Sequence, residues 1–148
     1  MHILGIDPGR EKVGLALVES DDGRLSRRLI LPASRLSRLD EHTRGWPIDG
    51  IVIGHSTAHD AVNRTLLDLM EQQRLPRLPL GIIDEKGSTL EARDLYWEAH
   101  PRRGWRRWVP VALQVPPEPL DDFAAAVIAR RWCRLHLDGL NRPTDAGT

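Results

Sequence analysis

The chain opens with the sequence HILGIDPGREKVGLALV, residues 2–18, in which two mostly apolar runs flank the turn Asp7-Pro8-Gly9. Short apolar runs of this kind are typical of buried β-strands, and a Pro-Gly pair marks a turn. The two runs therefore predict a β-hairpin. Asp22-Gly23 makes a second turn before residues 28–31, Arg-Leu-Ile-Leu, which predict a third antiparallel strand.

After these strands the pattern changes to alternating strands and helices. Residues 50–54 and 80–83 are apolar runs that predict buried strands, and the first is followed by apolar residues at helical spacing that end at residues 74–76. A capping-box spacing at Ser88 predicts a helix to about residue 100, and the alanine-rich residues 120–137 predict a last helix. Residues 37–44 are a weaker helical candidate. This order predicts an α/β fold with a mixed β-sheet, three antiparallel strands and then parallel strands, flanked by helices.

Composition favours a single globular domain. The chain has 148 residues, 41% of them hydrophobic, and we expect residues 1–138 to form the domain and residues 139–148 a flexible tail. Its 21 basic and 21 acidic residues cancel, so any contact with nucleic acid depends on local charge. The sequence shows no signal peptide and no apolar run near the ~20 residues of a membrane span. Cys133 is its one cysteine, which fits a reducing compartment. We therefore expect a cytoplasmic protein without membrane contact.

Three acidic positions lie where a predicted strand ends or a helix begins: Asp7, the pair Asp84-Glu85 and the pair Asp121-Asp122. Ligands gather beyond the carboxyl ends of parallel strands, so these carboxylates predict one site. Carboxylates are preferred ligands of Mg²⁺ or Mn²⁺, and three of them would suit two ions that cleave a phosphodiester. Each position also has a structural explanation, because acidic residues are common in turns and at helix N-termini.

Within each acidic pair the sequence leaves the choice open. Asp84 and Glu85 point in opposite directions if the strand continues, so only one of them is expected to face the metal. In the last pair, Asp122 shares a helix stripe with small residues that allow close packing on a sheet, which favours it narrowly over Asp121.

Taken together, these segments resemble the RNase H-like nucleases. Residues 3–17 look like their first strand pair, with the Asp-x-Gly-x-x-Lys/Arg-x-Gly pattern of the YqgF (RuvX) branch, and Asp-Pro-Gly is also similar to the RuvC Holliday junction resolvases. Residues 84–92, DEKGSTLEA, are similar to the YqgF signature Asp-Glu-Arg-x-Ser/Thr-Thr-x-x-Ala, and residues 122–128 resemble its closing helix.

The resemblance, which covers residues 2–135, implies an RNase H-like fold and a metal-dependent nuclease that matures the 5′ end of pre-16S ribosomal RNA. It also implies that Asp7, Glu85 and Asp122 are the catalytic, metal-binding carboxylates, with Asp84 and Asp121 as further candidates. The chain departs from the family after the central strand, where His55 and His59 replace the family's residues and could assist proton transfer.

Basic and aromatic residues predict the nucleic-acid contacts. Arginine binds phosphates and exposed tryptophan stacks on bases, so a loop rich in both favours RNA or DNA as the partner. The oligomeric state is left open between a monomer and a homodimer. The predicted contacts are Arg10, Lys12, Lys86, Arg102, Arg103, Trp105, Arg106, Arg107 and Trp108.

Three other functions remain open from the sequence. A RuvC-like Holliday junction resolvase makes paired cuts and would be a stable dimer. A binding module that lacks catalysis would bind nucleic acid without a metal. An actin-like nucleotide binder has a similar first hairpin, but such proteins bind nucleotide between two lobes and this chain is long enough for one.

Overall fold

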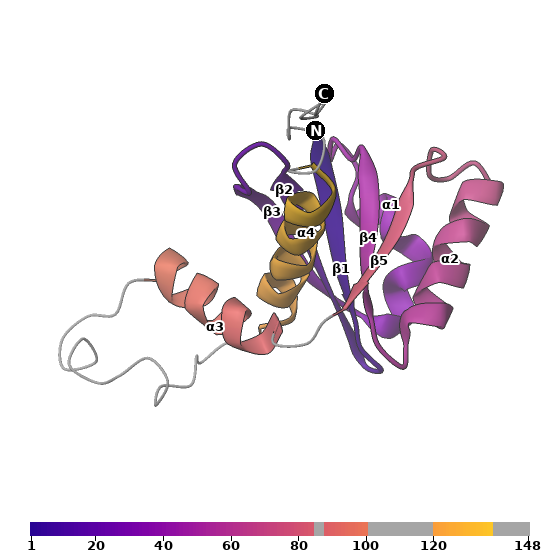
Figure 1. The fold of residues 1–148 in the computed structure, drawn as a ribbon. Helices are drawn as coiled ribbons and strands as arrows, with labels where there is room; N and C mark the ends of the chain where they lie inside the picture. The colour runs from indigo at the N-terminus through magenta and orange to yellow at the C-terminus, as the bar shows by residue number, and fades with distance from the viewer. Residues whose placement is uncertain (85–87, 101–119, 138–148) are drawn as a thin grey trace, which may run out of the picture.

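A computed structural model describes residues 1–84, 88–100 and 120–137, and its centre is a five-stranded sheet in the order β3-β2-β1-β4-β5 (Figure 1). The strands β1 (His2–Pro8), β2 (Lys12–Glu19) and β3 (Leu25–Pro32) form an antiparallel meander. The strands β4 (Gly50–His55) and β5 (Leu80–Asp84) continue the sheet parallel to β1. The mixed sheet predicted from the sequence is confirmed.

Helices cover both faces of this sheet (Figure 1). The 3-10 helix η1 (Ala33–Arg38), α1 (Leu39–His42) and α2 (His59–Glu71) lie on one face. The helices α3 (Ser88–Ala99) and α4 (Asp121–Leu137) lie on the other face. The weak helical candidate at residues 37–44 is thus divided between η1 and α1, and no helix within the described residues is long and apolar enough to cross a membrane.

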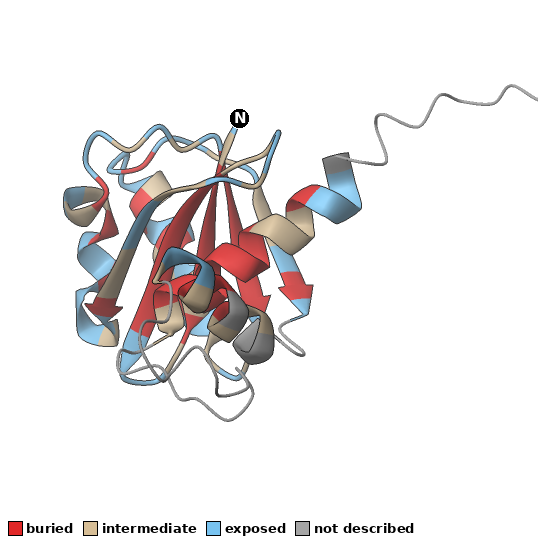
Figure 2. Ribbon diagram, turned by 90° about the vertical axis from the view of Figure 1, so that its left-hand side faces the viewer, coloured by how far each residue is buried: buried red, intermediate tan, exposed pale blue. Residues whose placement is uncertain are grey.

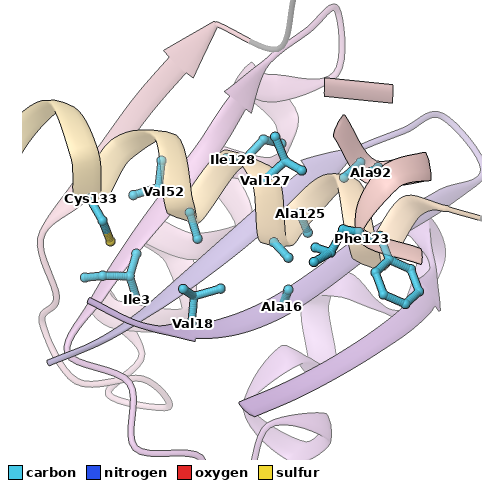
Figure 3. Close-up of a cluster of buried hydrophobic side chains, with 14 of the residues drawn as sticks. Ile3, Ala16, Val18, Val52, Ala92, Phe123, Ala125, Val127, Ile128 and Cys133 are labelled. Atoms are coloured by element: carbon cyan, nitrogen blue, oxygen red, sulfur yellow. The ribbon is translucent and has the colours of Figure 1, made fainter. Parts of the chain in front are cut away.

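The alternation of side chains along the strands divides the buried residues into two cores, one on each face of the sheet. The strands that contribute to both cores are largely buried and appear red in Figure 2. The core under α4 joins strand residues to the small and apolar residues of that helix, including Ile3, Ala16, Val18, Val52, Ala125 and Ile128 (Figure 3). The core under α2 contains Leu4, Ile6, Leu15, Leu17, Ile51, Ile53, Val62, Leu66 and Leu69.

The first strand extends further than its sequence predicts. Asp7 and Pro8 read as a turn, yet they pair with Gly14 and Val13 of β2 as the last residues of β1. Proline is tolerated at the end of a strand, where the hydrogen bond it cannot donate is not needed. This extension carries Asp7 on a regular strand rather than on a turn, which fixes the direction of its side chain.

Candidate active site

Asp7 lies near the end of β1, on the face of the sheet that α4 covers. Ile6 belongs to the core under α2, whereas a Cβ on Gly5 would lie 2.0 Å from the carbonyl oxygen of Ala125 in α4. Side chains alternate along a strand, so Asp7 shares the face of Gly5. Its side chain is half-buried there.

The first turn of α4 lies directly over the strand beside Asp7. Gly14 pairs with Asp7 across β1 and β2, and a Cβ at Gly14 would lie 1.9 Å from the carbonyl oxygen of Asp121. Only glycine leaves room for a helix backbone so close to a strand. The two acidic residues that begin α4, Asp121 and Asp122, are therefore brought to the same end of the sheet as Asp7.

The carboxylate of Asp122 is buried and already has two partners. Asp122 is 4% exposed, and its Oδ2 accepts a hydrogen bond of 2.8 Å from Nη1 of Arg28 in β3. Its Oδ1 accepts a hydrogen bond of 3.0 Å from the backbone N–H of Phe123. A buried carboxylate needs an opposite charge and hydrogen-bond donors, and Arg28 supplies the charge.

Asp121 is placed differently on the same helix turn. It lies on one stripe of α4 with Trp132, whose indole nitrogen would be 2.7 Å from a Cβ on Gly81 of β5. Asp121 thus lies on the side of α4 towards β5, while Asp122 is turned towards β3. It is half-buried, and its carboxylate has no hydrogen-bond or ion-pair partner within the described parts of the chain.

At the end of β5 the structure separates Asp84 from Asp7. Ile83 belongs to the core under α4, so the following residue, Asp84, lies on the face of α2. Asp84 is exposed and pairs along the backbone with His55 of β4. Glu85, the other acidic residue of this pair, lies outside the described residues.

The described carboxylates have the chemistry that Mg²⁺ and Mn²⁺ prefer, because carboxylate oxygens are hard ligands. They do not form a complete site: among the residues that the structure describes, no group of three or more His, Cys, Asp or Glu side chains could hold a metal ion. Asp7 and Asp121 lie at the same end of the sheet, and Glu85, another predicted ligand, lies outside the described residues.

The two histidines lie on the other face of the sheet. His55 is two residues beyond Ile53, which is in the core under α2, and its ring stacks on that of His59 with 4.5 Å between the ring centres. His59 contacts the carbonyl oxygen of Ser56 at 2.5 Å and the carboxylate of Asp60 at 3.0 Å. The structure does not bring these rings to the face of Asp7.

Only two of the predicted nucleic-acid contacts are described. Arg10 and Lys12 are exposed, one on the turn after β1 and the other at the first residue of β2. Both are close in sequence to Asp7 and lie at its end of the sheet. The remaining predicted contacts, outside the described residues, are Lys86, Arg102, Arg103, Trp105, Arg106, Arg107 and Trp108.

Arg28 is a site residue that the sequence analysis missed. The segment of residues 28–31 predicted a strand and nothing more. Arg28 pairs with Ala16 of β2, which is buried in the core under α4, so its side chain lies on the face of the sheet that α4 covers. A charged residue in such a strand is the sequence signal that could have drawn attention to it. Its partner Asp122 is 94 residues away along the chain, so only the fold reveals the contact.

Relatives of known name support the resemblance found in the sequence. No protein-family model matches the chain. A protein of Xylella fastidiosa named "Putative pre-16S rRNA nuclease" is 30% identical over 140 residues, which cover 88% of this chain and 85% of the relative. A protein of the same name from Xanthomonas oryzae is 29% identical over 143 residues, with the same coverage.

Solved structures share the fold. RuvC of Thermus thermophilus, in complex with a Holliday junction substrate, superposes with a TM-score of 0.59 at 15% identity over 93% of this chain and 96% of RuvC. The Fowlpox virus resolvase in complex with Holliday junction DNA has a TM-score of 0.58 at 9% identity over 96% of this chain and 100% of the resolvase. These neighbours show the RNase H-like fold. The 30% identity to the Xylella relative shows that the chain belongs to the YqgF family of nucleases.

Proposed function

We propose that the protein is a metal-dependent nuclease that hydrolyses phosphodiester bonds of RNA, with the 5′ end of pre-16S ribosomal RNA as its substrate. The observation that carries this proposal is the close approach of α4 to Gly14, which brings Asp121 to the same end of the sheet as Asp7. The names of the relatives, which specify pre-16S rRNA, support the choice of RNA. The cytoplasmic location that the sequence predicts would fit this role.

We propose Asp7, Glu85 and one carboxylate of α4 as the ligands of Mg²⁺ or Mn²⁺. Asp122, which the sequence favours, has both oxygens engaged by Arg28 and by the backbone of Phe123, so Asp121 is the better candidate. Glu85 follows Asp84, which strand alternation places on the other face, and this supports Glu85 as the ligand of that pair. Two bound ions would activate a water molecule and stabilise the leaving oxygen.

The protein's own residues position the substrate. Backbone pairing with β2 holds Asp7 near the end of the central strand β1, so its carboxylate needs little reorganisation before the reaction. Arg10 and Lys12, on and beside the neighbouring turn, would neutralise phosphates on one side of the cut. The arginines and tryptophans of residues 102–108 stay predicted contacts.

A Holliday junction resolvase is the second candidate, because both structural neighbours are resolvases in complex with such junctions. At 15% and 9% identity these neighbours support the fold and leave the substrate open. Paired cuts need two copies related by a two-fold axis. A stable homodimer that cuts a four-way junction symmetrically would favour this candidate over a monomeric RNA-processing enzyme.

The test compares labelled pre-16S RNA, single-stranded DNA and a four-way junction, each with Mn²⁺, Mg²⁺ or EDTA. Wild-type protein is measured beside Asp7→Asn and beside Asp68→Asn, which changes an exposed carboxylate on α2 and serves as the matched control. We expect cutting of RNA that requires the metal, falls at least about 100-fold in Asp7→Asn, and is unchanged in Asp68→Asn.

Cutting of the junction alone would replace the RNA substrate with the resolvase alternative. Binding of nucleic acid that persists in EDTA, with no cutting of any substrate, would instead identify a binding module that lacks catalysis.

A further inference from the structure

We propose that Arg28 binds a phosphate of the nucleic-acid substrate next to the cleavage site, and that Asp122 and Phe123 orient it for this contact. The inference rests on the proposed nuclease function and adds a substrate contact to it. Arg28 lies on β3, outside the hairpin of β1 and β2 that carries the family's motif.

Two contacts fix the guanidinium group of Arg28. Nη1 donates a hydrogen bond of 2.8 Å to Oδ2 of Asp122, and the guanidinium carbon lies 4.8 Å from the centre of the Phe123 ring. Asp122 is itself held by the backbone N–H of Phe123. An arginine held through both its edge and its face keeps one orientation, which lowers the entropy lost when it binds a further group.

Arg28 keeps donors for a ligand. The guanidinium has five N–H donors, and within the described residues its single hydrogen bond is the one to Asp122. The side chain is 40% exposed although its partner carboxylate is 5% exposed. One edge of the group is therefore buried against Asp122 and one face lies over the Phe123 ring. The remaining N–H donors are open to a phosphate, which arginine binds with charge-assisted hydrogen bonds.

The position of Arg28 in the sheet suits a phosphate that flanks the cleaved one. Arg28 pairs with Ala16, which pairs with Gly5, two residues before Asp7 on β1. Strand spacing and rise place the Cα atoms of Arg28 and Asp7 about 12 Å apart on the same face. A nucleic-acid backbone that passes the first turn of α4 would meet Asp7 on one side and Arg28 on the other.

A purely structural role would not explain this arrangement well. Burying an ion pair costs desolvation energy, and apolar residues of similar volume are often as stable or more stable. The pair is also open on the arginine side, where water weakens its contribution to stability. These features fit an arginine that is oriented for a ligand better than a device that stabilises the fold.

The experiment measures binding of a fluorescent single-stranded RNA in EDTA over a range of NaCl concentrations. Arg28→Ala should lower the affinity about tenfold and reduce the slope of log K against log salt by about 0.7, the value for one lost phosphate contact on a single strand. Arg27→Ala is the matched control: the same residue type on the same strand, paired with Leu17 of the opposite core and thus on the other face. It should change the affinity less than twofold.

Arg28→Lys covers the case in which Arg28→Ala fails to fold, because lysine keeps a charge beside Asp122. We expect RNA binding at least threefold weaker than wild type, since the planar fork is lost, with an unchanged Tm. Asp122→Asn should weaken RNA binding but leave the affinity for Mn²⁺, measured by calorimetry, within threefold of wild type. Asp7→Asn should lose the Mn²⁺ affinity.

Wild-type RNA affinity in Arg28→Lys, or a wild-type salt slope in folded Arg28→Ala, would overturn the proposal. Loss of Mn²⁺ binding in Asp122→Asn would also overturn it, because Asp122 would then be a metal ligand. Failure of the wild-type protein to cut RNA with any metal would instead refute the proposed function. The two failures are thus distinguishable.

Discussion

Gly14 determines how closely α4 approaches the sheet beside Asp7. Its missing side chain would lie 1.9 Å from the carbonyl oxygen of Asp121, and backbone atoms cannot move aside as the end of a flexible side chain can. We expect Gly14→Ala to lower the free energy of unfolding by about 3 kcal/mol, as overpacking does, and to abolish catalysis by displacing Asp121. Urea denaturation followed by circular dichroism measures the stability.

Gly50→Ala is the matched control for this prediction. A Cβ there would lie 3.3 Å from Cδ1 of Ile3, an atom at the end of a flexible side chain. A loss below about 1 kcal/mol is expected, since a rotamer change relieves the contact. Equal losses in both variants would show that the close approach of the helix is not the cause.

Cys133 is a buried thiol on α4. It is 5% exposed, and burial raises the pKa of the thiol above its ordinary value, because the charged thiolate is poorly solvated there. The thiolate is the reactive form, so a maleimide at pH 8 should react on the order of 100-fold more slowly with the native protein than with protein in urea. Rapid labelling of the native protein, followed by mass spectrometry, would contradict the assigned packing of α4.

Among the elements, α2 offers a direct test of the second core. Leu66 is fully buried, whereas its neighbour Leu67 is 49% exposed on the same helix. We expect Leu66→Ala to lower the free energy of unfolding by about 2–5 kcal/mol, through lost burial and the cavity left behind. Leu67→Ala should change it by less than about 0.5 kcal/mol, as a surface substitution does. Comparable losses by urea denaturation would place Leu67 in the core instead.

Elements with a strong local signal could be predicted from the sequence. The apolar runs at residues 50–54 and 80–83 are β4 and β5, and the spacing that begins at Ser88 does start a helix. Predictions were poorer where pairing with a distant segment overrides local preference. Asp7-Pro8 reads as a turn, but backbone pairing with β2 draws both residues into β1.

At the scale of the whole molecule, the candidate site depends on contacts between distant segments. The sequence predicted Asp7 and the acidic start of α4 from local patterns, and it favoured Asp122 narrowly over Asp121. That choice depends on Arg28, which lies 94 residues from Asp122, and no local pattern records such a pairing. Adjacent residues of a helix point about 100° apart, so the same turn of α4 directs Asp122 towards Arg28 and Asp121 away from it.

The same convergence of segments links metal binding to the stability of the whole fold. Asp7 and Asp121 come from distant parts of the chain, and the packing of α4 brings them to the same end of the sheet. An ion bound between them would therefore bind the folded state and not the unfolded chain. At free Mn²⁺ about 100 times its Kd, the folded state should gain about 2.7 kcal/mol. For a domain of this size that corresponds to a rise in Tm of about 5–10 °C, measured by calorimetry with and without Mn²⁺. Asp7→Asn should lose this rise while Asp68→Asn keeps it. An equal rise in Asp7→Asn would mean that Mn²⁺ stabilises the fold from another site, and the assignment of Asp7 as a ligand would have to be abandoned.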